Sequence, residues 1–146
     1  VLYEQLHQQK FISLIYAEYS SIDNTLTWVG AGQEYVLVLK NDNSVQVIKT
    51  GGVILGMVEE IEDKISQNRI FLEKGEKILL YTDGAVELRN SQSEMFSKER
   101  LVDAFRQTKG LNIRQTLDFL QQQLLYFSQG TSLYDDITLV VLEREN

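Results

Sequence analysis

The 146-residue sequence contains no cysteine, and its only histidine is His7. Without cysteine the chain has no disulfide, no thiolate zinc site, no iron–sulfur cluster and no cysteine nucleophile. With a single imidazole, a site built from several histidines within one chain is excluded as well. A serine–histidine–aspartate triad would have to use His7.

Basic charge and long apolar runs are also scarce. Fourteen Lys and Arg residues stand against 21 Asp and Glu residues, so the net charge is −7, and no basic cluster offsets it. Such a chain repels nucleic-acid backbones and anionic lipid surfaces. The longest clean apolar runs, 36–39 and 139–142, fall well short of the roughly 18–20 residues that a membrane helix needs. We expect one cytoplasmic globular domain that binds no nucleic acid.

Hydrophobic periodicity changes along the chain. Up to about residue 81 the apolar residues alternate or form short runs between turn residues, which is typical of strands. After Gly84 the spacing becomes helical, with Ser97 and Asn112 as expected N-caps and Gly110 and Gly130 as stop signals. The expected strands are 11–19, 26–29, 35–40, 44–49, 65–72, 77–81 and 137–142, the fifth and sixth flanking a tight turn. A run of strands, two helices and a final strand indicates an α+β fold with mainly antiparallel sheets.

Two acidic groups stand at the ends of expected strands. Asp83 follows the apolar run 78–81, and Asp135 and Asp136 precede the apolar run 137–141. Carboxylates placed at one sheet edge suit Mg²⁺ or Mn²⁺, which prefer oxygen ligands. Adjacent residues of an extended segment point to opposite faces, so we expect one of the paired aspartates to be a ligand and the other to support it. Taken singly, each motif also fits a plain turn or a solvated strand flank.

Taken in order, these motifs resemble a known family. Residues 72–90, from Leu-Glu-Lys-Gly through Tyr-Thr-Asp-Gly to Arg-Asn, resemble the signature of the bacterial SpoIIE-like serine/threonine phosphatases, a branch of the metal-dependent type 2C-like (PPM) superfamily. Residues 135–141 resemble the closing motif of that family, 53–56 its buried glycine-bearing connection and 28–33 its central strand and turn. The resemblance spans roughly residues 11–142 and implies an α-β-β-α sandwich.

The resemblance also implies a chemistry. Asp83 and Asp135 match metal-ligand aspartates, while Gly84, Asp136 and Thr138 would support and shape the site. Two Mn²⁺ or Mg²⁺ ions would activate a water molecule for hydrolysis of phosphoserine or phosphothreonine, so no side chain is expected to act as the catalytic nucleophile. The implied substrate is a regulatory phosphoprotein in bacterial signalling, of the anti-anti-sigma type, and relatives often carry a sensor domain upstream.

The sequence departs from the family pattern in two places. Relatives usually have Asn-Ala-Gly-His-Pro where residues 30–34 have Gln33 in place of the histidine. The family's N-terminal Gly-Asp and Asp-Gly motifs, which supply a metal-bridging aspartate, have no counterpart before Phe11. We therefore expect residues 1–146 to be the C-terminal portion of a single phosphatase domain. We also expect weak Mn²⁺ binding and a homodimer or strand exchange through uncovered edges.

Two other interpretations compete with a phosphatase. A catalytically inactive regulatory or binding module of the same fold is favoured by Gln33 and by the missing N-terminal motifs, and disfavoured by the retention of Asp83 and Asp135. A haloacid-dehalogenase-like hydrolase would need a nucleophilic aspartate two residues before Asp83. That residue is Tyr81, so we reject this second alternative.

Overall fold

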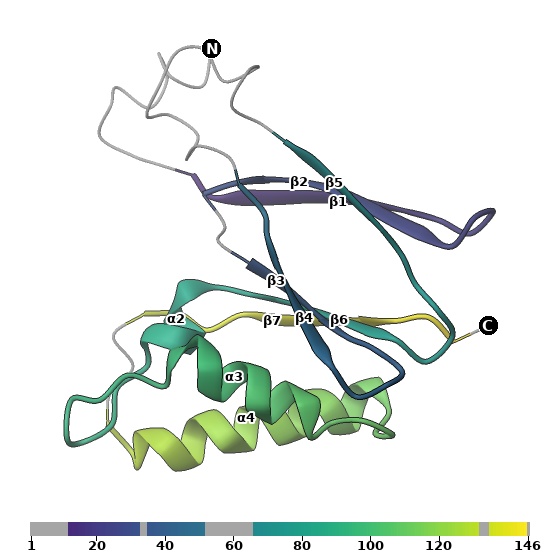
Figure 1. Cartoon of the computed structure of the whole chain (residues 1–146). Coiled ribbons are helices and arrows are strands. Elements are labelled where there is room, and N and C mark those ends of the chain that lie inside the picture. The colour runs from purple at the N-terminus through teal and green to yellow at the C-terminus, as the bar shows by residue number, and fades with distance from the viewer. Residues whose placement is uncertain (1–11, 33–34, 52–65, 132–134, 146) are drawn as a thin grey trace, which may run out of the picture. The chain divides into compact units, whose positions relative to one another are not determined.

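The computed structural model describes residues 12–32, 35–51, 66–131 and 135–145 (Figure 1). The chain divides into two compact units. The hairpin unit comprises 1–35 and 48–73, and the helical unit comprises 36–47 and 74–146. No helix within the described ranges is both long enough and apolar enough to span a membrane.

The hairpin unit is built on a three-stranded antiparallel sheet. Its strands are β1 (Leu14–Ser20), β2 (Thr25–Ala31) and β5 (Gln67–Phe71), in the order β1-β2-β5. The β1–β2 turn is closed by Asn24, whose φ of 56° lies in the left-handed region that asparagine tolerates. Leu26 and Trp28 are buried on one face of β2, as the alternation of strand side chains requires.

The helical unit carries a four-stranded sheet. Its strands are β3 (Tyr35–Leu39), β4 (Val45–Lys49), β6 (Lys77–Tyr81) and β7 (Leu139–Glu143), in the order β4-β3-β6-β7. The β6–β7 pair is antiparallel, with Tyr81 opposite Leu139 and Lys77 opposite Glu143. This register places the segment that follows β6 beside the segment that precedes β7.

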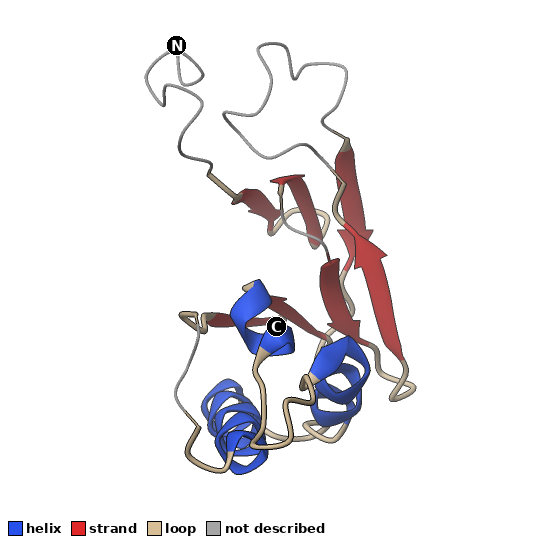
Figure 2. Ribbon diagram, turned by 90° about the vertical axis from the view of Figure 1, so that its left-hand side faces the viewer, coloured by secondary structure: helices blue, strands red, loops and turns tan. Residues whose placement is uncertain are grey.

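Three helices belong to the same unit: α2 (Asp83–Glu87), α3 (Ser97–Arg106) and α4 (Ile113–Ser128). In Figures 1 and 2, α3 and α4 lie against one face of the four-stranded sheet. Leu101 and Phe105 of α3 and Leu120 and Leu124 of α4 are buried. The apolar stripe of each helix therefore faces the core, as its spacing predicts.

Two charged side chains at the start of β6 are buried. Glu76 pairs with Lys40, with 2.5 Å between Oε2 and Nζ. The Lys77 ammonium donates to the Thr108 carbonyl oxygen at 2.9 Å, to Thr116 Oγ1 at 3.2 Å and to the Leu111 carbonyl oxygen. Burial lowers the pKa of Lys77 below its usual value of 10.5. Through these hydrogen bonds, Lys77 fastens the α3–α4 connection to the sheet.

Most expected elements are confirmed, including the α+β class and the antiparallel pairing. The Asn112 cap is present as a full capping box with Gln115. Ser97 was expected as a cap but is the first residue of α3, because Phe96 occupies the N-cap position. The expectations for His7, Gln33 and residues 53–56 lie outside the described residues.

Candidate functional site

The candidate site lies where β6 ends and β7 begins. One residue beyond the strand pair, the Thr82 amide donates to the Thr138 carbonyl oxygen at 3.1 Å, which prolongs the ladder toward the two acidic motifs. The Asp83 motif and the Asp135 motif, 52 positions apart in the sequence, are therefore neighbours in the fold. The expectation that they converge at one sheet edge is confirmed at the level of the backbone.

The Thr82 hydroxyl makes two further hydrogen bonds between these segments. Its oxygen donates to the Asp136 carbonyl oxygen at 3.2 Å and accepts from the Thr138 amide at 3.0 Å. Thr82 also occupies the N-cap position of α2, yet its side chain makes no capping hydrogen bond to that helix. The hydroxyl is committed to the segment that leads into β7.

Gly84 allows the two segments to approach closely. A Cβ atom built at Gly84 would lie 2.5 Å from the Asp136 carbonyl oxygen and 3.2 Å from the carbonyl carbon of the same residue. Such a contact with backbone cannot be relieved by moving a side chain, so any other residue here would push the segments apart. Gly84 is required for space, because its backbone is not among the glycines with positive φ.

Asp83 and Asp135 share the same local arrangement. Oδ1 of Asp83 accepts from the Gly84 amide at 3.0 Å, and Oδ1 of Asp135 accepts from the Asp136 amide at 2.8 Å. Both residues are exposed. In the described part of the chain, no donor contacts Oδ2 of either carboxylate. Each aspartate thus keeps one carboxylate oxygen, Oδ2, without a hydrogen bond from the described residues. Oxygen is the ligand atom that Mg²⁺ and Mn²⁺ prefer.

The carboxylates alone are too few for a complete protein-built metal cage. Among the described residues, no group of three or more histidine, cysteine, aspartate or glutamate side chains could hold a metal ion. Asp83 and Asp135 therefore form at most part of a ligand set, which fits Mg²⁺ chemistry with one or two carboxylates and several waters.

Asp135 and Asp136 line different cavities. Asp135 lines a small cavity of about 230 Å³ together with Gly84, Glu87, Leu88 and Arg89. Asp136 instead lies on the rim of a larger groove of about 650 Å³. That one of the adjacent aspartates is a ligand and the other supports it stays a prediction.

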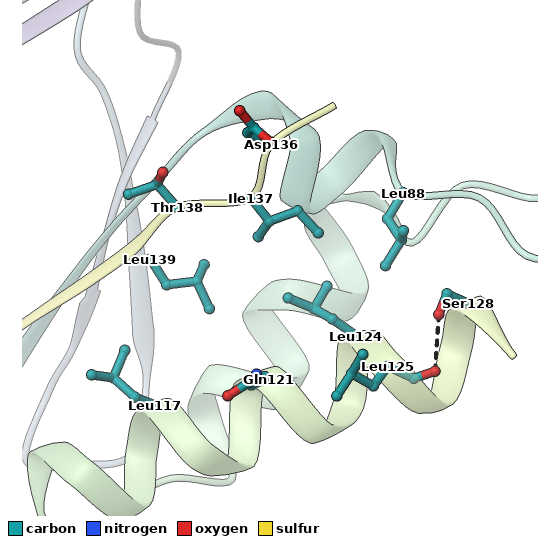
Figure 3. Close-up of a pocket in the computed structure, with 10 residues that line it drawn as sticks. All are labelled: Leu88, Leu117, Gln121, Leu124, Leu125, Ser128, Asp136, Ile137, Thr138 and Leu139. Carbon is teal, nitrogen blue, oxygen red and sulfur yellow. Dashed lines mark hydrogen bonds between the residues drawn. The ribbon is translucent and has the colours of Figure 1, made fainter. Parts of the chain in front are cut away.

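The larger groove is apolar. Figure 3 shows Ile137 and Leu139 pointing toward α4, where Leu117 and Leu124 face them, while Asp136 and Thr138 point away. The labelled polar side chains of this segment therefore point away from the helix. Apolar side chains from both α4 and this segment form the lining of the groove.

Of the residues expected at the site, Asp83, Gly84, Asp135 and Asp136 are brought together. Thr138 is also present, but it contributes its backbone amide and carbonyl to Thr82. The sequence interpretation assigned no role to Thr82. Its place between an apolar strand and an Asp-Gly pair predicts an N-cap, and nothing in that pattern reveals the hydrogen bonds to residues 136 and 138.

Comparison with known sequences places the whole chain in one family. The family described as Stage II sporulation protein E (SpoIIE) matches residues 1–145. The phosphoserine phosphatase RsbU of Bacillus subtilis strain 168 is 27% identical over 146 residues, which is 99% of this chain and 42% of RsbU. The chain spans less than half the length of the curated relatives it matches.

Solved structures agree on the fold. The SiaA-PP2C domain of Pseudomonas aeruginosa matches 93% of this chain with a TM-score of 0.81 and 17% identity, over 53% of its own length. The phosphatase domain of the cell fate determinant SpoIIE from Bacillus subtilis, presoaked with Mn, matches 91% of this chain with a TM-score of 0.70 and 14% identity, over 56% of its own length. These likenesses confirm the PP2C-type fold predicted from the sequence.

Proposed function

Because this chain belongs to the SpoIIE family, we propose that it carries the C-terminal part of a metal-dependent protein serine/threonine phosphatase that acts in bacterial signalling. The whole protein would hydrolyse phosphoserine or phosphothreonine on a regulatory protein. The relative RsbU is named a phosphoserine phosphatase, and the fold matches phosphatase domains.

One observation carries the proposal: Asp83 and Asp135 are drawn to the same end of the β6–β7 pair by contacts that a plain turn does not need. The Gly84 backbone lies against the Asp136 carbonyl, and the Thr82 hydroxyl bridges residues 136 and 138. A solvated turn at Asp83 or a strand flank at Asp135 requires neither contact. The contacts bring the backbone of the two aspartate motifs together, and both aspartates are exposed.

Asp83 and Asp135 would hold divalent cations, Mn²⁺ or Mg²⁺, while Oδ1 of each carboxylate accepts a hydrogen bond from the next backbone amide. When bound, a pair of such ions supplies an acidified water as nucleophile and offsets charge on the phosphoryl oxygens. Gly84 and Thr82 keep the two aspartates in register, and Asp136 adds negative charge beside Asp135. No side chain of the chain needs to act as the nucleophile.

For the substrate, we propose a phosphorylated regulator of the anti-anti-sigma type, and for the compartment, the cytoplasm. The family resemblance supports both assignments. The described surface near Asp135 supports a phosphoprotein in one respect, because Arg89 lines the small cavity next to Asp135 and could offset anionic charge there.

The test is Mn²⁺-dependent hydrolysis of a phosphoserine protein by the full-length gene product. Asp83→Asn and Asp135→Asn each remove one ligand charge at nearly constant volume, and Asp118→Asn on the exposed face of α4 is the matched control. We expect each ligand variant to lose more activity than the about 10–100-fold typical of outer-shell partners, while Asp118→Asn retains it. Unchanged activity in both ligand variants would refute the site assignment.

A non-catalytic regulatory module remains the second candidate. The observation that favours it is the shortage of ligands, since the described residues form no group of three that could hold a metal. This candidate predicts that the full-length protein hydrolyses no phosphoserine at any Mn²⁺ concentration, yet still binds its phosphoprotein partner. The same assay, run with a pull-down of the partner, separates the two functions.

A further inference from the structure

We infer that Thr82 is a positioning residue, and that its hydroxyl sets the spacing between Asp83 and Asp135. As far as it concerns metal binding, this inference rests on the function proposed above. As far as it concerns the placement of the two segments, it rests only on the geometry of residues 82–84 and 135–138.

The Thr82 hydroxyl uses both its donor and its acceptor on the same opposing segment. It donates to the carbonyl oxygen of Asp136 and accepts from the amide of Thr138. A hydroxyl is the only small side-chain group that donates one hydrogen bond and accepts another through a single atom. Serine can replace it in this role, whereas the isosteric valine cannot.

The hydrogen bonds of Thr82 depart from the usual behaviour of a threonine at an N-cap. Threonine at that position normally accepts from an amide in the first turn of its own helix. Thr82 makes no such hydrogen bond, so α2 begins without side-chain capping. The hydroxyl bridges to the segment carrying Asp135 and Asp136 in place of stabilising its own helix.

Among the described residues, few other hydrogen bonds join residues 135–138 to residues 82–84. Residues 135–138 lie before the first residue of β7 and outside its ladder. Within the described ranges, three hydrogen bonds join 135–138 to 82–84. One runs from the Thr82 amide to the Thr138 carbonyl oxygen, and the other two are made by the Thr82 hydroxyl. Removing the hydroxyl leaves one of these three hydrogen bonds. The Asp136 carbonyl oxygen and the Thr138 amide then lose their bonds to Thr82.

The test uses the 146-residue chain labelled with ¹⁵N, in the forms Thr82→Val, Thr82→Ser and Thr131→Val. Thr131 is the matched control, because its hydroxyl also bonds a carbonyl oxygen, that of Arg89 at 2.8 Å, whereas the hydroxyl bonds to residues 136 and 138 within the described ranges come from Thr82. Circular dichroism verifies that each variant is folded. If Thr82→Val does not fold, Thr82→Ala removes the same hydroxyl without a branched side chain.

The metal-free readout is hydrogen exchange at the Thr138 amide, which reports local opening of the segment. We expect faster exchange in Thr82→Val, and protection as in the wild type in Thr82→Ser and Thr131→Val. The metal readout is paramagnetic broadening of the Gly84 and Asp136 amides by Mn²⁺, which detects weak binding. We expect Thr82→Val to require about 10-fold more Mn²⁺ for half-maximal broadening of these amides. That is the low end of the loss of metal affinity seen when a residue that supports a metal ligand is removed.

Three results would overturn the inference: Thr82→Val behaves as the wild type, Thr82→Ser fails to restore the wild-type values, or Thr131→Val shifts the Mn²⁺ midpoint as far as Thr82→Val does. A different failure belongs to the proposed function. If Mn²⁺ broadens neither amide in the wild type, the expectation that this chain binds Mn²⁺ weakly is wrong, and the Thr138 exchange rates alone decide whether Thr82 positions the segment.

Discussion

The two sheets differ in how their strands are covered. In the helical unit, residues 36–39 of β3 have no exposed surface, and the helices cover one face of the sheet. In the hairpin unit, β1 exposes half of Leu14 and 63% of Tyr16. The candidate site stands on the unit with the dense core, which indicates that the placement of Asp83 and Asp135 depends on β6, β7 and α4.

The contrast has a physical reason. A core at close-packed density transmits small displacements, because side chains have no free volume in which to relax. β6 belongs to this packed core, since Ile78 and Leu79 have no exposed surface, and it is fastened through Lys77 to the α3–α4 connection and the start of α4. The edge strand β1 of the hairpin unit is mostly exposed, so substitutions at its exposed positions should have smaller effects.

The largest effect is expected from Phe105→Ala in α3. Phe105 has no exposed surface, and truncation of a buried phenylalanine lowers the free energy of unfolding by about 3–5 kcal/mol through lost burial and the cavity left behind. Urea denaturation monitored by tryptophan fluorescence and by circular dichroism measures the loss. A loss no larger than that of an exposed substitution would break the comparison between the two units.

Lys77→Met should have the next largest effect. The substitution keeps the apolar stem but leaves the Thr108 and Leu111 carbonyls and the Thr116 hydroxyl without their charged donor. Because an unsatisfied buried polar group costs about 1–3 kcal/mol, we expect a loss of about 2 kcal/mol in thermal or urea unfolding. Lys49→Met, on an exposed position of β4, is the control and should be nearly neutral.

Lys77 also predicts an alkaline dependence. Burial lowers its pKa in the folded chain below the usual 10.5, so between those two values the unfolded chain holds more protons. The free energy of unfolding then rises with pH in that window. The rise should be present in the wild type and absent in Lys77→Met when both are denatured at a series of alkaline pH values.

In the hairpin unit, Tyr16→Thr should change stability little. Tyr16 is mostly exposed on the edge strand β1, and threonine retains strand propensity, so the expected change lies within about 0.5 kcal/mol. Chemical denaturation measures it beside Phe105→Ala. Sedimentation of the same samples tests the homodimer predicted from the sequence, which remains a prediction.

The smallest effect is expected at the Asp23 turn. Hydrogen bonds from Ser20 and Thr25, with the nearby Arg69 cation, hold the pKa of this exposed carboxyl below 3.8. Its stabilisation is present at neutral pH and is lost as pH falls through the lowered pKa. Asp23→Asn should therefore weaken only the acid dependence below about pH 4. An identical acid unfolding curve for the variant would contradict this.

The sequence predicted the elements better than their arrangement. Periodicity located the hairpin strands and α4, including the Asn112 cap, because these features are local. The strands on either side of the tight turn at 73–76 enter different sheets, since strand pairing is decided by tertiary contacts. The five-residue helix α2 was missed because an Asp-Gly pair reads as a turn.

At the site, the sequence predicted the meeting of Asp83 with Asp135 through motif resemblance and strand position. The sequence predicted only that Gly84 helps to shape the site. The structure gives the reason, because Gly84 lies so close to the Asp136 carbonyl that a Cβ atom would clash with it. The bridging hydroxyl of Thr82 could not be predicted, because its partners are 54 and 56 residues away. Long-range hydrogen bonds leave no periodic signal in a single sequence.

We propose that Asp83 and Asp135 hold a divalent cation in the full-length protein. The most direct measurement is a crystal structure of the full-length protein grown with Mn²⁺, with anomalous diffraction data collected at the manganese edge. We predict anomalous peaks in direct contact with a carboxylate oxygen of Asp83 and of Asp135. Manganese peaks that contact neither aspartate, in crystals of an enzyme that hydrolyses phosphoserine, would contradict the claim.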